Sequence, residues 1–181
     1  MRENNRKKIL DAAVRVVQRD GVNRLTLEAV AEETGVTRGG MTYHFRDRAA
    51  LSLALQEHLA SSWEESLTRA AGKAADQATA KEKAAAYATV AMASATSGEL
   101  ELILQGGRDA SLSEPWRQVL QRWTPSIEDA IADPTAMRLF ILRLAADGLW
   151  VYDSLNGHKL STERRQTIAD QITTFADGKL P

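Results

Sequence analysis

Apolar residues recur every three or four positions along most of the chain, which is the spacing that places them on one face of an α-helix. Ala, Leu, Glu, Arg and Gln dominate the sequence, and runs of β-branched residues are short. These residues favour helices, so the sequence predicts an all-α protein. Residues 99–104 begin with an alternating Glu-Leu-Glu-Leu, but a lone strand would have no partner, so we expect a short helix there.

Three short helices are expected at the start of the chain. The apolar face of the first consists of Ile9, Ala12, Ala13, Val16 and Val17. Asp20-Gly21 should end this helix, because glycine accepts the left-handed backbone that follows a helix. Thr26 can cap the second helix and Gly35 can end it, and Thr37 can cap a third helix that runs to Phe45.

Two longer segments follow. Asp47 can cap a fourth helix, whose apolar or neutral residues repeat at helical spacing. They are Leu51, Ala54, Leu55, His58, Leu59, Ser62, Trp63 and Leu67. Small and polar residues at 72–79 predict a loop, and the alanine-rich stretch after it predicts a helix over about 81–95.

The C-terminal part carries three more helical patterns. Ser113 can cap the first, and Pro125 should kink it because proline removes one backbone donor. Its expected apolar face is Trp116, Val119, Leu120, Trp123, Ile127 and Ile131. Asp133-Pro134 should open a nearly all-apolar helix that ends at Leu155, and Ser161 should cap the last helix. The residues of the last helix expected to point inward are Ile168, Ile172 and Phe175.

The residues between 26 and 51 predict a helix-turn-helix. Gly35 permits the sharp reversal between two short helices, where a side chain would cost energy at positive φ. The second of these helices would enter a major groove with its N-terminal residues at the base edges. Those residues are Thr37, Arg38, Gly39, Thr42 and Tyr43. Arg38 can donate two hydrogen bonds to guanine, and Gly39 and Gly40 would let the helix backbone approach the DNA closely.

Charge is divided unevenly along the chain. Residues 1–50 hold ten Lys or Arg and seven Asp or Glu, whereas residues 51–181 hold thirteen and seventeen. A basic first part joined to an acidic remainder favours nucleic-acid binding by the first part alone. The chain has no cysteine and no apolar run near the roughly 20 residues of a membrane span. We therefore expect a cytoplasmic protein without disulfides or thiolate zinc sites.

No arrangement of residues points to catalysis. The three histidines, His44, His58 and His158, form no His-x-x-x-His pair, and none follows a glutamate by three residues. The sequence contains neither a Gly-x-Ser-x-Gly elbow nor a phosphate-cradling glycine loop. We expect neither an enzyme nor a metal or cofactor site. His58 is interpreted as a satisfied histidine of the core or the edge of a pocket.

The helix-turn-helix resembles the DNA-binding domain of the tetracycline-repressor (TetR) family. The residues that carry the resemblance are Thr26-Leu27, Ala31-Glu32, residues 34–45, Arg48 and Leu51. Its most specific part is Tyr43-His44-Phe45, followed by two residues, a basic residue, two further residues and a leucine. The resemblance covers about residues 5–52 and implies that three helices bind DNA, while the remaining helices bind an effector and form a dimer.

The resemblance also implies roles for individual residues. Tyr43 and His44 would contact phosphates, as would Arg48 from the start of the fourth helix. The family usually has lysine in place of Arg48, and arginine is the better bidentate phosphate partner. The expected DNA-binding residues are Thr26, Thr37, Arg38, Gly39, Thr42, Tyr43, His44 and Arg48. Basic residues near the N-terminus are expected to reach the DNA backbone too; they are Arg2, Arg6 and Lys7.

The C-terminal part resembles a subgroup of multidrug-responsive repressors from actinobacteria. Residues 115–125 and 144–151 carry this resemblance, which implies an aromatic pocket for planar cationic drugs. The expected effector-binding residues are Trp63, Tyr87, Met92, Trp116, Phe140, Asp147 and Trp150. Core packing is an equal alternative for each tryptophan. For Asp147, an ion pair with Arg143 one turn earlier is favoured over a counter-charge for a cationic effector.

Together these features predict a ligand-responsive, DNA-binding transcriptional regulator. Residues 1–46 are expected to form the DNA-binding domain, and residues 47–181 the effector-binding and dimerisation domain. A homodimer would pair through the last two helices, at about 134–155 and 161–175, and bind a palindromic operator. A small planar aromatic or cationic effector would release this repressor. A helical ligand-binding protein without DNA binding and an all-helical enzyme are the two alternative classes.

Overall fold

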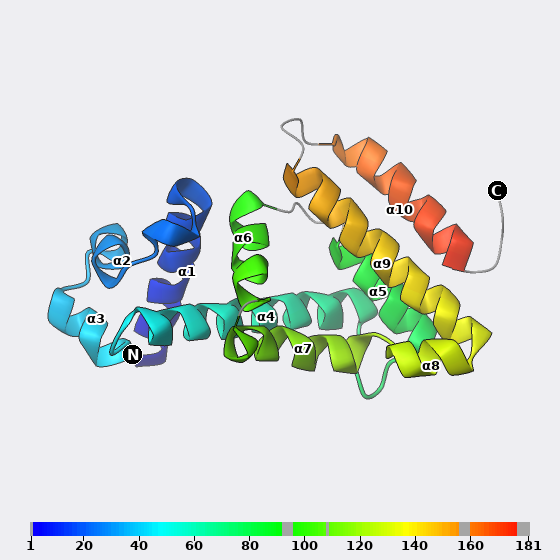
Figure 1. The fold of residues 1–181 in the computed structure, drawn as a ribbon, viewed down its shortest axis with the longest axis horizontal. Helices are drawn as coiled ribbons and strands as arrows, with labels where there is room; N and C mark the ends of the chain where they lie inside the picture. The colour runs from blue at the N-terminus through cyan, green and yellow to red at the C-terminus, as the bar shows by residue number, and fades with distance from the viewer. Residues whose placement is uncertain (1, 92–95, 108, 156–159, 177–181) are drawn as a thin grey trace. The chain divides into compact units, whose positions relative to one another are not determined.

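The computed structural model describes residues 2–91, 96–107, 109–155 and 160–176. Within these residues the chain forms α-helices and one short 3-10 helix, η1, with no strand, which confirms the all-α prediction (Figure 1). The elements of the N-terminal part are α1 (Arg2–Asp20), η1 (Val22–Arg24), α2 (Leu27–Thr34), α3 (Arg38–His44) and α4 (Arg48–Ala71). The later elements are α5 (Ala80–Ala91), α6 (Ser97–Gly106), α7 (Ala110–Trp123), α8 (Ile127–Ala132), α9 (Pro134–Leu155) and α10 (Thr162–Ala176).

The chain divides into two compact units. The first unit consists of Met1–Ser61 and Thr96–Trp116, and the second of Ser62–Ala95 and Arg117–Pro181. The helices α4 and α7 each contribute one part to the first unit and one part to the second. None of the helices within the described residues has both the length and the apolarity that crossing a membrane requires.

Helices α1, α2, α3, α6 and the start of α4 enclose one apolar core in the first unit. All five residues predicted for the apolar face of α1 are buried in it. Its other buried members are Leu10, Val22, Leu25, Val30, Met41, Phe45, Leu51, Ala54, Leu55 and Leu102. Leu102 comes from α6, so a helix far along the chain completes the core that α1–α4 begin.

The predicted caps of the first unit are confirmed. The side chains of Thr26 and Thr37 accept hydrogen bonds from the backbone N–H three residues on, at 3.0 and 3.2 Å. Asp47 Oδ1 accepts the N–H of Ala50 at 2.8 Å and so caps α4. Gly35 ends α2 in the left-handed region at φ 71°, where a residue with a side chain would be strained.

The short helix expected at 99–104 is also confirmed, and it begins earlier. Thr96 and Glu99 form a capping box at the start of α6, in which each side chain accepts the backbone N–H of the other residue. The reason for a glycine at position 98 is close packing against α1. A Cβ atom on Gly98 would lie 3.1 Å from the Cα of Gln18. Helix α6 therefore lies against the backbone of α1.

A buried glutamine connects three helices of the first unit. Gln56 on α4 is 1% exposed. Its Nε2 donates to the carbonyl of Leu102 on α6 at 2.8 Å, and its Oε1 accepts the indole N–H of Trp116 on α7 at 2.7 Å. Both ends of the carboxamide are thus satisfied, as burial of a polar group requires.

In the second unit, α9 packs against α5, α8 and α10. Ala84 and Ala88 of α5 are buried against Leu139 and Leu142 of α9, and Ile172 of α10 packs on this cluster. The caps predicted at Asp133 and Ser161 are confirmed, since their side chains accept the N–H groups of Ala136 and Arg164, respectively.

A buried ion pair joins α9 to α10. Arg165 Nη2 lies 2.8 Å from Asp153 Oδ2, and the other Asp153 oxygen accepts the N–H of Leu160 at 2.9 Å. Both side chains are largely shielded from water, so loss of either partner would leave a buried charge unpaired.

The prediction of one kinked helix after Ser113 was wrong. Helix α7 begins at Ala110 and ends at Trp123, and α8 is a separate helix that starts at Ile127. Pro125 lacks the N–H that would continue α7, and Ser126 and Asp129 form a new capping box. As a result, two residues expected inward, Ile127 and Ile131, are 46% and 74% exposed. Ile168 and Phe175 of α10, also expected inward, are 37% and 43% exposed.

Helix α5 begins at a capping box formed by Thr79 and Glu82. Glu82 Oε2 accepts the N–H and the hydroxyl of Thr79, and Lys73 Nζ lies 2.8 Å from Glu82 Oε1. These hydrogen bonds, led by the one from Lys73, lower the pKa of Glu82 from 4.5 to about 2. The Glu82 carboxylate therefore stabilises the folded protein above pH 4.5, its pKa in the unfolded chain, and this stabilisation is lost as the pH falls towards 2.

Replacing Gln56 with leucine should lower the free energy of unfolding by about 2 kcal/mol, because the indole N–H of Trp116 loses its buried partner. Urea unfolding followed by circular dichroism measures this change. The control is Gln121→Leu, at an exposed position of α7, which should change the free energy by less than about 0.5 kcal/mol. Equal effects of the two substitutions would show that the Gln56 hydrogen bonds contribute nothing to stability.

Replacing Glu82 with glutamine should lower the urea midpoint at pH 7, and this difference from the wild type should shrink as the pH falls below about 4.5. The shrinkage follows because the Glu82 carboxyl of the unfolded wild-type chain is protonated below about 4.5, whereas the folded protein keeps this carboxylate ionised until the pH approaches 2. Unfolding curves at pH 7, 5, 4 and 3 measure it. Glu65→Gln, an exposed change on α4, is the control. A difference that is independent of pH would contradict the role given to the ionised carboxylate.

Candidate functional sites

Helices α2 and α3 form a helix-turn-helix whose inner side is fixed by apolar residues. Val30 of α2 and Met41 of α3 are fully buried, and Phe45 after α3 is 2% exposed. Gly35 and Val36 make the turn between the helices, and Thr37 starts α3. Because Met41 and Phe45 hold one side of α3 in the core, the opposite side of this short helix faces outward.

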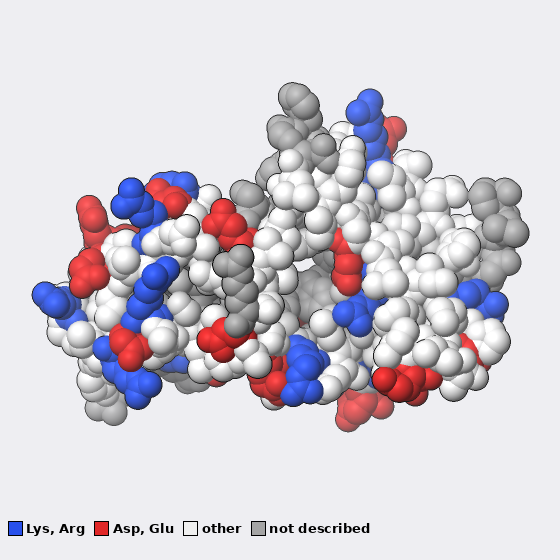
Figure 2. Space-filling model, in the orientation of Figure 1, with Lys and Arg blue, Asp and Glu red and all other residues white. Residues whose placement is uncertain are grey.

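The outward side of α3 carries residues suited to contact a duplex. Arg38, Gly39, Thr42 and Tyr43 are all exposed, and Tyr43 is 65% exposed. Figure 2 shows Lys and Arg side chains interspersed with Asp and Glu over the surface formed by α1–α3. On the face in view, this surface is therefore not uniformly basic.

The two glycines of α3, Gly39 and Gly40, differ in what surrounds them. A Cβ atom on Gly39 would meet nothing within 4 Å, which leaves its backbone open to a ligand. A Cβ atom on Gly40 would lie 2.7 Å from Cγ1 of Val36. Gly40 therefore packs closely against Val36 inside the helix-turn-helix, which is a second reason for a glycine here, and its close approach to DNA stays a prediction.

The threonine hydroxyls of this surface already form hydrogen bonds within the protein. Thr42 Oγ1 donates to the carbonyls of Arg38 and Gly39 at 3.1 and 3.2 Å, so its hydroxyl hydrogen is engaged, while its methyl group and the lone pairs of its oxygen are left for a base. Thr26 and Thr37 accept backbone N–H groups as caps, which leaves each hydroxyl hydrogen able to donate to a phosphate oxygen.

Tyr43 and His44 lie together at the end of α3. Their rings make an edge-to-face contact with centroids 5.1 Å apart, and His44 is half-buried. Arg46, which follows them, was not among the residues expected from the sequence. Its side chain is 85% exposed and lies 3.1 Å from Asp47. Its position between Tyr43 and Arg48 could have marked it, from the sequence alone, as a further exposed cation beside the expected DNA contacts.

Arg48 and the N-terminal cations make contacts within the first unit. Arg48 is exposed, and its Nη2 donates to the backbone carbonyl of Val22 at 3.1 Å. Arg6 lies over the ring of Phe45, and Lys7 bonds Asp11 at 3.2 Å. The side chain of Arg2 is outside the described residues.

His58 is a satisfied histidine, as expected. Its Nε2 lies 2.9 Å from Asp11 Oδ1, so the pair joins α4 to α1. His158 lies outside the described residues. Within the described ranges, no three His, Cys, Asp or Glu side chains come together in a group that could hold a metal ion.

A second cluster of candidate residues lies in the second unit. Trp63 and Tyr87 pack edge to face with centroids 5.1 Å apart, and Tyr87 donates its hydroxyl to Asp147 Oδ1 at 2.5 Å. Arg143 Nε lies 3.4 Å from Asp147 Oδ2, and its guanidinium lies 5.9 Å from the ring centre of Phe140. We call Trp63, Tyr87, Phe140, Arg143 and Asp147 the aromatic–acidic cluster.

Burial shapes the electrostatics of this cluster. It raises the pKa of Asp147, while the hydrogen bond from Tyr87 and the charge of Arg143 act in the opposite direction. Burial also raises the pKa of Tyr87 far above its usual value, with the negative Asp147 adding to the shift. Tyr87 therefore remains a hydrogen-bond donor. The ion pair favoured for Asp147 in the sequence is present.

The other predicted effector residues do not join the described contacts of this cluster. Trp116 belongs to the first unit, where it bonds Gln56. Trp150 is half-buried on α9, and Met92 lies outside the described residues. Trp123 is 1% exposed and donates to Glu64, so core packing accounts for this tryptophan.

Comparison with known proteins identifies both parts of the chain. A family described as "Tetracyclin repressor-like, C-terminal domain" matches residues 81–177, more than half of the chain, and "Bacterial regulatory proteins, tetR family" matches residues 9–55. The transcriptional regulator TtgR from Pseudomonas putida is 42% identical over 57 residues, which are 32% of this chain and 27% of TtgR. AcrR from Shigella flexneri is 39% identical over 49 residues, which are 27% of this chain and 23% of AcrR. The chain thus matches only about a quarter of these relatives' length.

Solved structures share the fold. A transcriptional regulator from Pseudomonas aeruginosa PAO1 superposes with a TM-score of 0.67 at 15% identity, covering 98% of this chain and 92% of that one. The multidrug binding protein EbrR complexed with malachite green gives 0.60 at 22% identity, covering 92% and 96%. The helix-turn-helix geometry and both family matches lead to one conclusion: the chain belongs to the tetracycline-repressor (TetR) family of DNA-binding transcriptional regulators.

Proposed function

We propose that this regulator is a repressor, which binds a palindromic operator as a homodimer and leaves it when a small effector binds. The observation that carries the proposal is the two-sided α3. Met41 is fully buried while Arg38, Thr42 and Tyr43 are exposed on the same seven-residue helix. A short helix that is buried on one side and exposes polar side chains on the other can present those side chains to the bases of a major groove.

The contacts divide into those that read bases and those that hold the backbone. Arg38 sits in the first turn of α3, where its guanidinium can bond guanine through two donors. The Thr42 methyl group suits a thymine methyl, and Gly39 lets the helix approach. Phosphate contacts are assigned to the side chains of Thr26, Thr37, Tyr43, His44 and Arg48, because all can donate a hydrogen bond.

The dimer is proposed to form through α9 and α10. Exposed apolar residues repeat along one face of α9, and further ones lie on α10. They are Ile141, Leu144, Val151 and Leu155 on α9, and Ile168 and Phe175 on α10. Figure 2 shows few charged side chains over α9 in this view. To bind a palindromic operator, such a dimer must present its two α3 helices about 34 Å apart, one turn of DNA.

The aromatic–acidic cluster is the proposed effector site. Trp63 and Tyr87 offer aromatic faces, and Asp147 offers a carboxylate in surroundings that disfavour its charge. A planar cation would gain stacking and would supply positive charge to Asp147 in place of Arg143. Trp150, half-buried on α9 of the same unit, remains a proposed contributor, and so does Met92, which lies outside the described residues. EbrR, whose structure with malachite green has the same fold, supports this class of ligand.

Release from DNA sets an energetic requirement. Moving a two-state equilibrium from about 1:99 to 99:1 takes about 5.5 kcal/mol of differential effector affinity. Burying one planar aromatic ligand provides energy of this order, since apolar surface contributes about 25 cal/mol per Å² when it leaves water. The effector must therefore bind the DNA-free form far more tightly than the DNA-bound form.

DNA recognition is tested by selecting random duplexes with the purified protein and sequencing the recovered fraction. Enrichment of an inverted repeat is expected, with half-sites about one helical turn apart. Arg38→Ala should relax the preference at one base position by about 1–3 kcal/mol, whereas Tyr43→Ala should weaken binding to all duplexes alike. Arg69→Ala, which removes an exposed charge at the end of α4, is the control. Recovery of no enriched sequence would overturn the proposal.

The effector site is tested by calorimetric titration with malachite green. Trp63→Ala should weaken binding by about 1–3 kcal/mol, because it removes an aromatic face. Asp147→Asn should weaken binding of this cationic dye by removing the counter-charge. Asp76→Asn, in an exposed turn, removes the same charge elsewhere and should leave affinity unchanged. If Trp63→Ala binds the dye and releases DNA like the wild type, the site lies elsewhere.

A further inference from the structure

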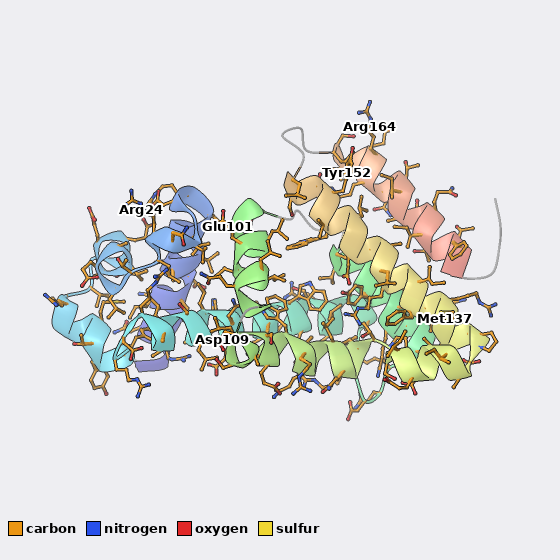
Figure 3. All side chains as sticks on the ribbon, viewed as in Figure 1. Arg24, Glu101, Asp109, Met137, Tyr152 and Arg164 are labelled. Atoms are coloured by element: carbon orange, nitrogen blue, oxygen red, sulfur yellow. The ribbon has the colours of Figure 1, made fainter. Side chains whose placement is uncertain are left out.

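The backbone of Val22 is held by two charged side chains that are distant in sequence. Its N–H donates to Glu101 Oε2 of α6 at 2.9 Å. Its carbonyl accepts a hydrogen bond from Arg48 Nη2, at the start of α4, at 3.1 Å. Figure 3 shows Glu101 on the side of α6 that faces α1. The turn after α1 therefore links a carboxylate on α6 to the guanidinium expected to contact DNA.

The turn that receives Glu101 is closely fitted to its carboxylate and is held by backbone hydrogen bonds. Gly21 has φ +82°, and a Cβ atom there would lie 3.3 Å from Glu101 Oε2. Val22 is 6% exposed, and its carbonyl also accepts the N–H of Leu25 at 3.2 Å. A carbonyl oxygen has two lone pairs, so it serves both Leu25 and Arg48. Glycine at position 21 thus permits both the turn and the approach of the carboxylate.

The position of Glu101 is set by the packing of α6. Leu102, the next residue, is 2% exposed in the core of the first unit. Its carbonyl accepts the Gln56 bond from α4, and Gly98 fits against the backbone of α1. A shift of α6 along or around its axis would break these contacts together with the Glu101–Val22 bond. The hydrogen bond from Val22 to Glu101 therefore forms only when α6 is correctly placed against α1.

We propose that Glu101 is a positioning residue for DNA binding, which acts through Val22 to hold the guanidinium of Arg48 ready for a phosphate. An arginine has five N–H donors, so the bond to Val22 leaves others for phosphate oxygens. A side chain ordered before binding loses less conformational freedom on binding. The inference rests on the proposed phosphate contact of Arg48, and it makes that contact dependent on α6.

Charge alone predicts the opposite effect of Glu101. Its carboxylate belongs to the unit that carries α3, and a negative charge near DNA repels phosphates. Removing it should therefore strengthen DNA binding if Glu101 has no positioning role. If it positions Arg48, removing its acceptor oxygens should weaken DNA binding instead. The sign of the effect separates the two roles.

Two substitutions isolate the acceptor from the charge. Glu101→Gln removes the charge but keeps an oxygen that can accept the Val22 N–H, whereas Glu101→Met keeps the length and has no oxygen. Affinity is measured by fluorescence anisotropy with a duplex recovered in the selection above. Glu101→Met should bind about three- to tenfold more weakly, and Glu101→Gln should bind at least as tightly as the wild type.

A double-mutant cycle shows whether the effect passes through Arg48. Glu101→Met should cause no further loss in the Arg48→Ala background, and its full loss in the Tyr43→Ala background. Thermal unfolding checks that each variant is folded. Should Glu101→Met prove unstable, Glu101→Asp replaces it, because its shorter side chain withdraws the carboxylate from Val22 while keeping the charge.

The outcomes distinguish this inference from the proposed function. If neither Arg48→Ala nor Tyr43→Ala weakens binding to the recovered duplex, the proposed DNA contacts are wrong. If Arg48→Ala weakens binding but the loss from Glu101→Met adds to it in full, Glu101 does not act through Arg48. Tighter binding by Glu101→Met would also overturn the inference.

Discussion

The burial of one side of α3 is the constraint on which the rest of the DNA-binding surface depends. This helix has seven residues, and helices shorter than about 12 residues are marginal in water by themselves. Met41 and Phe45 anchor it in a core built by α1, α2, α4 and α6. Because the helix is rigid only through this core, its exposed residues keep a defined orientation only while the core is intact. DNA recognition and the stability of the first unit are therefore coupled.

Several cations of the first unit have acidic partners within the unit. Arg15 and Arg19 share Glu33, and ion pairs among exposed groups of this kind contribute little to stability. Such pairs orient side chains and reduce non-specific attraction to polyanions. Arg38 and Arg48 differ, because one stands on the outward side of α3 and the other bonds only a backbone carbonyl among the described contacts. Specific positions, rather than net charge, thus make this surface suitable for a duplex.

The charges of the aromatic–acidic cluster in the second unit are also paired internally. Asp147 already interacts with Tyr87 and Arg143, so a cationic effector of the proposed kind would have to compete with an internal cation. Competition of this kind favours ligands that add a large aromatic surface to their charge, since charge exchange alone gains little. The same contacts join α5 to α9 and make the cluster part of the fold of its unit. Ligand binding there would therefore change how these two helices are held together.

The sequence alone determined the features that depend on residues within one helical turn. The caps at Thr26, Thr37 and Asp47 and the left-handed Gly35 are local, so spacing and residue type were sufficient to predict them. The helix break at Pro125 was mistaken for a kink because a proline signals both, and the capping box after it decided between them. Contacts such as Gln56 with Trp116, or Glu101 with Val22, join residues 60 and 79 positions apart. Only the packing of whole helices decides which side chains meet at such separations, because the sequence specifies the apolar faces but not the residues that come opposite one another.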